Sequence, residues 1–204
     1  MSFWHEQVLP RATDRILGVG QVHKLRSRAC EGLGGHVVEI GYGSGLNAEH
    51  YPSAVTSVAA VEPLDVAWGL AQRRIEQTSA EVFRAGLDGQ RLDLATGSFD
   101  SALSTFTMCT VPDLDAALSE LARVLEPGGS LHFLEHGLAP DPGVAKWQHR
   151  LDPVQGLLAG GCHLDRDIRG YVERSGLELV EIDTFYGFGP KVVGYVYLGR
   201  AVKR

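Results

Sequence analysis

Short apolar runs and longer amphipathic segments alternate along much of the chain. Runs of strand length lie at residues 36–40, 58–61, 102–105 and 130–134. A first helical segment is expected to end near Cys30, and the glycine-rich turn at 41–45 predicts a further helix directly after it. Another helix is predicted after Asp113, a capping residue type, because the following apolar side chains recur at helical spacing: Leu114, Ala117, Leu118, Leu121, Val124 and Leu125.

The order of these elements predicts how the strands are connected. Strands separated by helices need crossover connections, so we expect an α/β fold whose sheet is mainly parallel, with helices on both faces. The C-terminal part differs, because the strand-like runs at 177–185 and 191–202 are joined only by residues 186–190. A link this short cannot hold a crossover helix and predicts an antiparallel hairpin. In such folds, ligands bind beyond the carboxyl ends of the parallel strands.

Composition restricts the functional classes. The 204 residues, 44% hydrophobic and 22% charged, are typical of one globular domain that folds without disulfides or a structural metal. Lys and Arg number 19 against 25 Asp and Glu, and the net charge of −6 argues against a nucleic-acid partner. The three cysteines show no CxxC spacing, which indicates reduced thiols and a cytoplasmic location. We interpret the local basic groups as solvated helix faces; they are Lys24, Arg26, Arg28, Arg73 and Arg74.

The N-terminal segment is amphipathic. It contains no run long enough for a signal peptide, and no apolar stretch of about 18 residues follows, so we expect neither secretion by that route nor a membrane span. Its apolar residues lie near Arg11 and Arg15, which would permit peripheral contact with a membrane. We favour a helix that folds back over its own domain. The apolar residues are Phe3, Trp4, Val8, Leu9, Ile16 and Leu17.

Glycines gather directly after the run at 36–40. Gly41, Gly43 and Gly45 accept positive φ and carry no Cβ, so the backbone here can approach a ligand closely. Glu62 ends the next strand, where a carboxylate can accept both hydroxyls of a ribose. Leu46 stands where the dinucleotide fingerprint needs its third glycine, and the phosphate-binding P-loop motif is absent. The pattern therefore favours a nucleoside over a dinucleotide and disfavours a nicotinamide-dependent oxidoreductase.

Four segments together resemble the Rossmann-like S-adenosylmethionine-dependent methyltransferases. They are VVEIGYGSG (37–45), VAAVEP (58–63), FDSALSTFTMCTVPD (99–113) and LARVLEPGGSLHFLEH (121–136). The resemblance implies a three-layer Rossmann-like fold with a seven-stranded, mainly parallel sheet and an antiparallel C-terminal hairpin. It also implies one methyltransferase domain over 1–204. Its parts are an N-terminal helical cap at 1–31, a cofactor-binding half at 32–136, and substrate-side helices with the hairpin at 137–204.

The same resemblance implies how the chain holds S-adenosylmethionine and its product S-adenosylhomocysteine. Glu39 would orient the methionine amino group, Glu62 would bind the ribose hydroxyls, and Pro63 would lie beside the adenine. Asp88 either replaces the acid that the family often has near the adenine or is a turn residue before Gly89. The complete expected set is Glu39, Gly41, Tyr42, Gly43, Gly45, Asn47, Glu62, Pro63, Gly86, Leu87, Asp88 and Thr105.

The second half of the chain resembles the thiol S-methyltransferase branch of these enzymes. The segments concerned are EHG (135–137), KWQHRLDP (146–153) and GGCHLDRDI (160–168). Thiol S-methylation of a small apolar acceptor is therefore the leading hypothesis. Members of that branch carry a hydrophobic N-terminal anchor, which we do not find in this sequence. The alternatives are O-, N- or C-methylation of a lipid-, quinone- or phenol-like molecule, and a non-catalytic sensor or partner protein that only binds the nucleoside.

Candidate catalytic residues are imidazoles and a carboxylate near the expected site. His136 follows a strand at its carboxyl end and His163 lies beside Cys162, so either could raise the thiolate fraction of an acceptor. Asp152 could orient a histidine. We favour Cys109 and Cys162 as packed thiols; the alternative is that they act as metal or metalloid ligands with His163 and His136. No metal is expected, because the spacing is too irregular to support a metal site. The candidate acceptor pocket comprises Phe106, Trp147, Cys162 and Tyr186.

Overall fold

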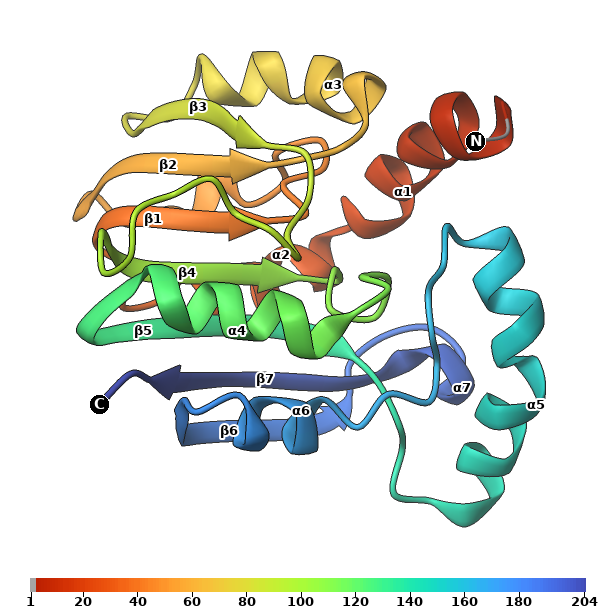
Figure 1. Cartoon of the computed structure of the whole chain (residues 1–204). Coiled ribbons are helices and arrows are strands. Elements are labelled where there is room, and N and C mark those ends of the chain that lie inside the picture. Colours follow the sequence, from red (N-terminus) through yellow and green to blue (C-terminus); the bar gives the residue numbers. More distant parts are fainter. Residues whose placement is uncertain (1–2) are drawn as a thin grey trace.

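Seven strands form one sheet in the order β3-β2-β1-β4-β5-β7-β6 (Figure 1), in a computed structural model that describes residues 3–204. β7 pairs antiparallel with β5 and β6, and the other neighbours pair in parallel. This confirms the α/β class and the antiparallel C-terminal pair. The strands are β1 (Gly35–Ile40), β2 (Val55–Val61), β3 (Glu81–Gly86), β4 (Phe99–Thr105), β5 (Leu125–His136), β6 (Glu178–Tyr186) and β7 (Tyr195–Val202).

Helices cover both faces of the sheet, as expected for a three-layer fold (Figure 1). α4 (Leu114–Val124) and α6 (Ile168–Arg174) pack on one face, while α2 (Gly20–Cys30) and α3 (Asp65–Ile75) pack on the other. The remaining helical segments are η1 (Trp4–Val8), α1 (Leu9–Leu17), η2 (Ala48–His50), α5 (Pro142–Leu158) and α7 (Lys191–Gly194).

Successive residues of a strand supply the two apolar layers. Val37 packs in the cluster beneath α2, while Val38 packs in the cluster beneath α4. The last four residues of β1 are all buried, because helices shield both faces of a central parallel strand. Because β1 pairs in parallel with β2 and β4, the carboxyl ends of these three strands lie at the same edge of the sheet.

Several elements differ from the sequence predictions: no apolar run predicted β3, and β5 begins at Leu125, five residues before the predicted run at 130–134. The helix expected directly after the glycine loop is wrong, because only the single 3₁₀ turn η2 forms there. Tyr51 is extended (φ −64°, ψ 128°), as a residue before a proline prefers, and Pro52 thus ends the turn. At the hairpin, α7 occupies the start of the predicted second strand, so β7 begins at Tyr195.

The N-terminal segment folds back over the domain, as we favoured. α1 lies beyond the carboxyl ends of the parallel strands (Figure 1) and is tethered there through Asp14, whose Oδ1 accepts a hydrogen bond from Ser44 Oγ (2.7 Å) and lies 2.9 Å from Arg74 Nη1. Trp4 Nε1 donates to the Leu158 carbonyl at the end of α5 (2.8 Å). Within residues 3–204, no helix combines the length and apolar character needed to cross a membrane.

Candidate active site

A cavity of about 610 Å³ opens at the carboxyl ends of the parallel strands. The loops after β1, β2, β3 and β4 line it, together with η1, α1 and the end of α5. This volume lies within the range of small-molecule sites. Nine predicted residues belong to the lining, namely Gly41, Tyr42, Gly43, Glu62, Pro63, Leu87, Asp88, Thr105 and Phe106.

The glycine loop needs its glycines for backbone geometry. Gly41, Gly43 and Gly45 all have positive φ, at 66°, 59° and 75°. A Cβ at Gly41 would overlap the side chain of Thr107, another lining residue. The loop therefore presents bare backbone to the cavity, as the sequence predicts. Gly45 itself, like Gly86, lies outside the lining.

Glu62 ties the glycine loop to the end of β2. Its Oε2 accepts a hydrogen bond from the Gly43 backbone N–H (2.7 Å), and its Oε1 accepts one from Leu64 N–H (2.8 Å). The side chain is buried, and burial raises the pKa of the carboxyl despite these two bonds. Each carboxylate oxygen keeps a second lone pair. Glu62 can thus accept hydroxyl donors from a ligand while it holds the loop.

Glu39 lies behind the cavity in a polar network. It is 1% exposed, and it accepts hydrogen bonds from Asn47 Nδ2 (2.8 Å) and from the Tyr51 hydroxyl. Burial raises the pKa of Glu39 to about 7. Neither Glu39 nor Asn47 lines the cavity. Their effect on a ligand would pass through the residues that they hold in place, Thr105 and Arg26.

Arg26 corrects the interpretation of its basic group as a solvated face. It is only 4% exposed, lines the cavity, and donates from Nη1 to Asn47 Oδ1 (2.8 Å) and Thr105 Oγ1 (2.7 Å). Its Nε is buried and has no hydrogen-bond partner among residues 3–204. The sequence held a signal for this burial, since residue 26 shares one helical face with the buried Val22, Leu25, Ala29 and Cys30.

Asp88, expected near the adenine, and Phe106, expected near the acceptor, both line the cavity. Asp88 lines it and is at the same time a turn residue, because its Oδ1 accepts hydrogen bonds from the backbone and side chain of Gln90 (2.9 and 2.8 Å). Phe106 lines it with φ 53°, a strained value for a non-glycine residue. The Arg26 guanidinium lies 5.4 Å from the centre of the Phe106 ring.

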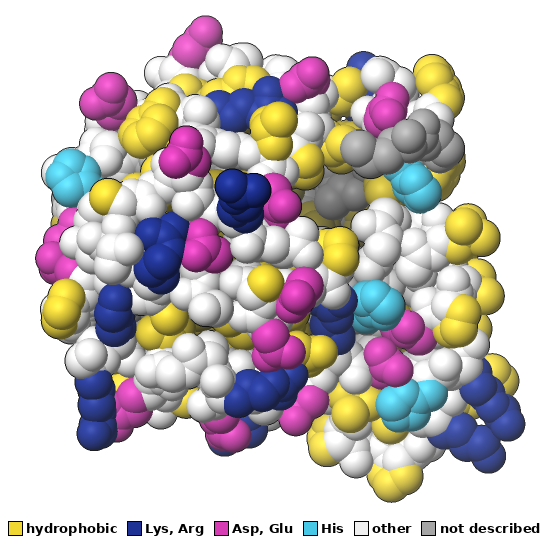
Figure 2. Space-filling view, viewed as in Figure 1, with side chains coloured by type: hydrophobic (Ala, Val, Ile, Leu, Met, Phe, Trp, Pro, Cys, Tyr) yellow, Lys and Arg dark blue, Asp and Glu magenta, His cyan; other side chains and the backbone are white. Residues whose placement is uncertain are grey.

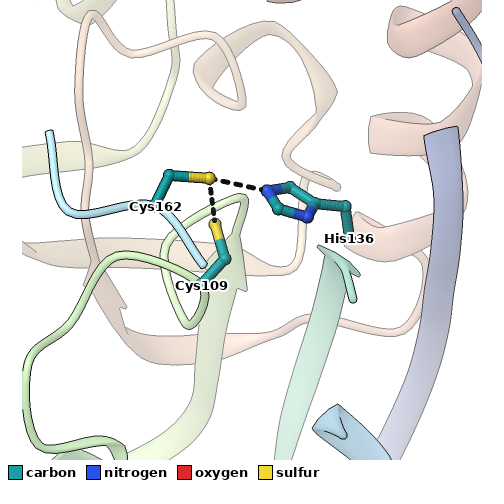
Figure 3. A group of neighbouring side chains, drawn as sticks. All are labelled: Cys109, His136 and Cys162. Carbon is teal, nitrogen blue, oxygen red and sulfur yellow. Dashed lines mark hydrogen bonds between the residues drawn. The ribbon is translucent and has the colours of Figure 1, made fainter. Parts of the chain in front are cut away.

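His136 and Cys162 meet at the carboxyl end of β5, next to a second cysteine (Figure 3). His136 Nε2 lies 2.9 Å from Cys162 Sγ, and the Cys162 and Cys109 sulfurs are 3.7 Å apart. The hydrogen bond with Cys109, followed by that with His136, holds the pKa of Cys162 well below its usual range. Burial lowers the pKa of His136, but the contact with Cys162 and the nearby carboxylate of Glu135 together outweigh burial and raise that pKa. None of the three residues lines the cavity.

The other predicted catalytic and acceptor residues lie farther from the cavity. His163 Nδ1 pairs with Asp152 Oδ2 of α5 (2.9 Å), and neither is a lining residue. Tyr186 donates its hydroxyl to Asp141, and Trp147 is 54% exposed. Figure 2 shows apolar side chains exposed over α5, where the exposed residues are Trp147, Leu151, Val154, Leu157 and Leu158. The structure does not bring this predicted acceptor set together.

Comparisons with known proteins identify the family of the chain. A family model described as a methyltransferase domain matches residues 38–133, which include the glycine loop and Glu62. The human thiol S-methyltransferase TMT1A is 31% identical over 152 residues, which cover 72% of this chain and 61% of that protein. The mouse thiol S-methyltransferase TMT1B is 30% identical over 186 residues, covering 80% of this chain and 72% of the relative.

The fold is similar to that of a solved methyltransferase. The crystal structure of an S-adenosylmethionine-dependent methyltransferase from Thermotoga maritima superposes with a TM-score of 0.68 at 21% identity, covering 100% of both chains. This likeness concerns the fold, while the sequence relatives and the family model concern the family. The chain belongs to the S-adenosylmethionine-dependent methyltransferases, and among them it is similar to the thiol S-methyltransferases.

Proposed function

We propose that this protein transfers the methyl group of S-adenosylmethionine to a small apolar thiol. The observation that supports this most strongly is the cavity at the carboxyl ends of the strands, where the bare glycine loop, the carboxylate of Glu62 and the buried cation of Arg26 meet. The sequence relatives named as thiol S-methyltransferases support a thiol as the acceptor.

The residues that line the cavity fit the polar groups of the cofactor. Glu62 has acceptor capacity for ribose hydroxyls beyond its two backbone bonds. Arg26 offers an unpartnered, buried Nε to the methionine carboxylate, and a charge-assisted bond of this kind is among the stronger hydrogen bonds in proteins. We assign the product S-adenosylhomocysteine to the same contacts, because it shares these groups.

The chain contributes to the reaction by positioning a nucleophile and excluding water. When bound, the cofactor supplies an electrophilic methyl group on a sulfonium. The acceptor sulfur must lie in line with the methyl carbon and the cofactor sulfur, and the apolar part of the lining suits an apolar acceptor. The apolar lining residues come from α1 and from the loop after β4: Leu9, Pro10, Leu17, Val111 and Pro112.

A thiol needs little help from a base. Thiols lose their proton far more readily than alcohols do, and the thiolate that forms is a strong nucleophile. Because His136, His163 and Asp152 all lie outside the lining, the proposal gives none of them the acceptor proton. The proton passes to water as the thioether forms.

A matched panel of acceptors tests the proposal. Purified protein is incubated with S-adenosylmethionine carrying a labelled methyl group and with an alkyl thiol, alcohol or amine of equal chain length, or a phenol. We expect labelled thioether from the thiol and a much lower rate from the other three. Transfer only to another acceptor would refute the thiol assignment. Cofactor binding without transfer to any of the four would favour the non-catalytic alternative.

A further inference from the structure

Three residues of metal-binding types, two cysteines and a histidine, gather beside the cavity although the sequence spacing shows no metal motif. Cys109 comes from the loop after β4, His136 ends β5, and Cys162 follows α5 (Figure 3). Their sulfur and nitrogen atoms all lie within 4.8 Å of one another. The side chains are 1%, 8% and 6% exposed, so the cluster is closed off from bulk solvent.

The spacing of these atoms is close to that of a tetrahedral zinc site. With zinc–sulfur bonds of about 2.3 Å, two ligand sulfurs lie about 3.8 Å apart, and a ligand sulfur and nitrogen lie about 3.6 Å apart. The Cys109 and Cys162 sulfurs are 3.7 Å apart. The sulfur of Cys162 and Nε2 of His136 are 2.9 Å apart, so the imidazole would withdraw by about 0.7 Å to admit the ion.

Polar atoms at this place also lack partners. His136 Nδ1 and the neighbouring Glu135 Oε2 are both buried without a hydrogen-bond partner among residues 3–204. Buried polar atoms in native proteins are almost always satisfied, by protein groups, by ordered water or by an ion. A histidine that binds a metal through one ring nitrogen commonly donates its other ring N–H to a carboxylate, a backbone carbonyl or water. Nδ1 of His136 is available for such a partner while Nε2 faces the sulfur of Cys162, so the orientation of the imidazole suits an ion bound at Nε2.

We propose that Cys109, His136 and Cys162 bind one thiophilic divalent cation, with Zn²⁺ as the ion tested. Two thiolates and an imidazole match the ligand set of zinc and exclude Mg²⁺ and Ca²⁺, which require oxygen ligands. Three protein ligands leave the fourth position to water or another small ligand. Two other groups in residues 3–204, around His50 and around His163, contain no sulfur and are partly exposed, so the proposal does not extend to them.

An ion here would join segments that shape the cavity. Thr110, next to Cys109, and Gly160, two residues before Cys162, both line the cavity. The ion would thus fix the loop after β4 to the segment after α5. This proposal goes beyond the methyl-transfer function, since metal binding can be measured without cofactor or acceptor.

Cobalt substitution provides the test. The full chain is stripped with a chelator, kept reduced, and titrated with Co²⁺ and then with Zn²⁺. We expect a thiolate-to-cobalt charge-transfer absorption that saturates at one equivalent and disappears when Zn²⁺ displaces the cobalt. Cys109→Ser and Cys162→Ser should each weaken binding by more than about 100-fold, because loss of an outer-shell partner alone costs about 10- to 100-fold.

Matched controls separate this site from other thiols and from unfolding. Cys30→Ser removes another buried free thiol, and Asp152→Asn alters the group around His163; both variants should keep the absorption. X-ray absorption of the unsubstituted zinc complex needs no variant and should give two sulfur ligands and an imidazole. The proposal is wrong if no one-to-one complex forms, if the bound ion has only oxygen and nitrogen ligands, or if Cys109 and Cys162 form a disulfide under these reducing conditions.

Discussion

Replacing Arg26 with methionine tests whether the buried cation holds the carboxylate of the cofactor. Methionine has a similar length and packs well among the apolar side chains of α2, but it removes the charge and both hydrogen bonds from Nη1. The donors to Asn47 Oδ1 and Thr105 Oγ1 are lost, and Glu39 loses the cation that opposes its burial. Ligand affinity and stability should therefore both change.

The magnitudes follow from the contacts. A hydrogen bond to a charged group contributes about 1.5–3 kcal/mol, which corresponds to about 10- to 150-fold in Kd for S-adenosylhomocysteine. Loss of the guanidinium also leaves the buried Asn47 Oδ1 without its Arg26 donor, and an unsatisfied buried polar group costs about 1–3 kcal/mol of folding stability. We therefore expect a stability loss of about 1–3 kcal/mol.

Calorimetry with two ligands isolates the carboxylate contact. S-adenosylhomocysteine carries the amino-acid group, whereas 5′-methylthioadenosine lacks it but keeps the nucleoside. Arg26→Met should weaken the first ligand and leave the second unchanged. Arg28→Met is the matched control, because Arg28 lies on the same helix but is exposed and paired with Asp183 (2.8 Å). Equal losses for both ligands, or no loss for either, would refute the assignment.

Three further predictions concern the cofactor side of the cavity. Glu62→Gln should weaken the binding of S-adenosylhomocysteine by at least about tenfold in calorimetry, since an amide cannot accept both backbone N–H groups and two hydroxyls. The control Glu120→Gln also alters an acceptor of a backbone N–H but should leave this binding unchanged. Glu39 has a pKa of about 7 in the folded protein, above its ordinary 4.5, so its contribution to stability is lost as the pH rises from about 4.5 to about 7. In denaturant unfolding without cofactor, the free energy of unfolding should fall by on the order of 3 kcal/mol less over this pH range in Glu39→Gln than in the unchanged protein. The same pH profile in both proteins would disprove the pKa shift. Gly41→Ala should abolish the binding of S-adenosylhomocysteine and lower the melting temperature, because the added Cβ overlaps Thr107. The control Gly69→Ala, in open space on α3, should raise the melting temperature slightly. Equal effects of the two substitutions would contradict the loop geometry.

Local patterns were sufficient for the fold class and for one half of the site, whereas the seventh strand was implied only by the family resemblance, since no apolar run predicted β3. The glycine loop and Glu62 each directly follow an apolar run of strand length. Their place at the carboxyl ends of strands could therefore be predicted from neighbouring residues in the sequence. The short link before residue 191 was likewise enough to predict the antiparallel pair. The helix expected after the glycine loop failed because Pro52, a local feature, outweighs the general pattern of strand, turn and helix.

The remaining site residues depend on contacts across the fold. Arg26 could have been found, because it shares the apolar face of its helix, but its charge suggested a surface position. The cluster of Cys109, His136 and Cys162 has no local signal, since three separate segments supply one residue each. Trp147 lies in a segment that resembles the family, and Tyr186 was predicted for the pocket as an aromatic residue. Trp147 is nevertheless exposed on α5, and the Tyr186 hydroxyl donates to Asp141.

The central claim is that the cavity binds the S-adenosylmethionine pair of donor and product. The most direct measurement is a calorimetric titration of the purified protein with S-adenosylmethionine, S-adenosylhomocysteine and, as a control, NAD. The account predicts one-to-one, micromolar binding of the first two and no binding of NAD. Binding of NAD alone, or of none of the three, would contradict it.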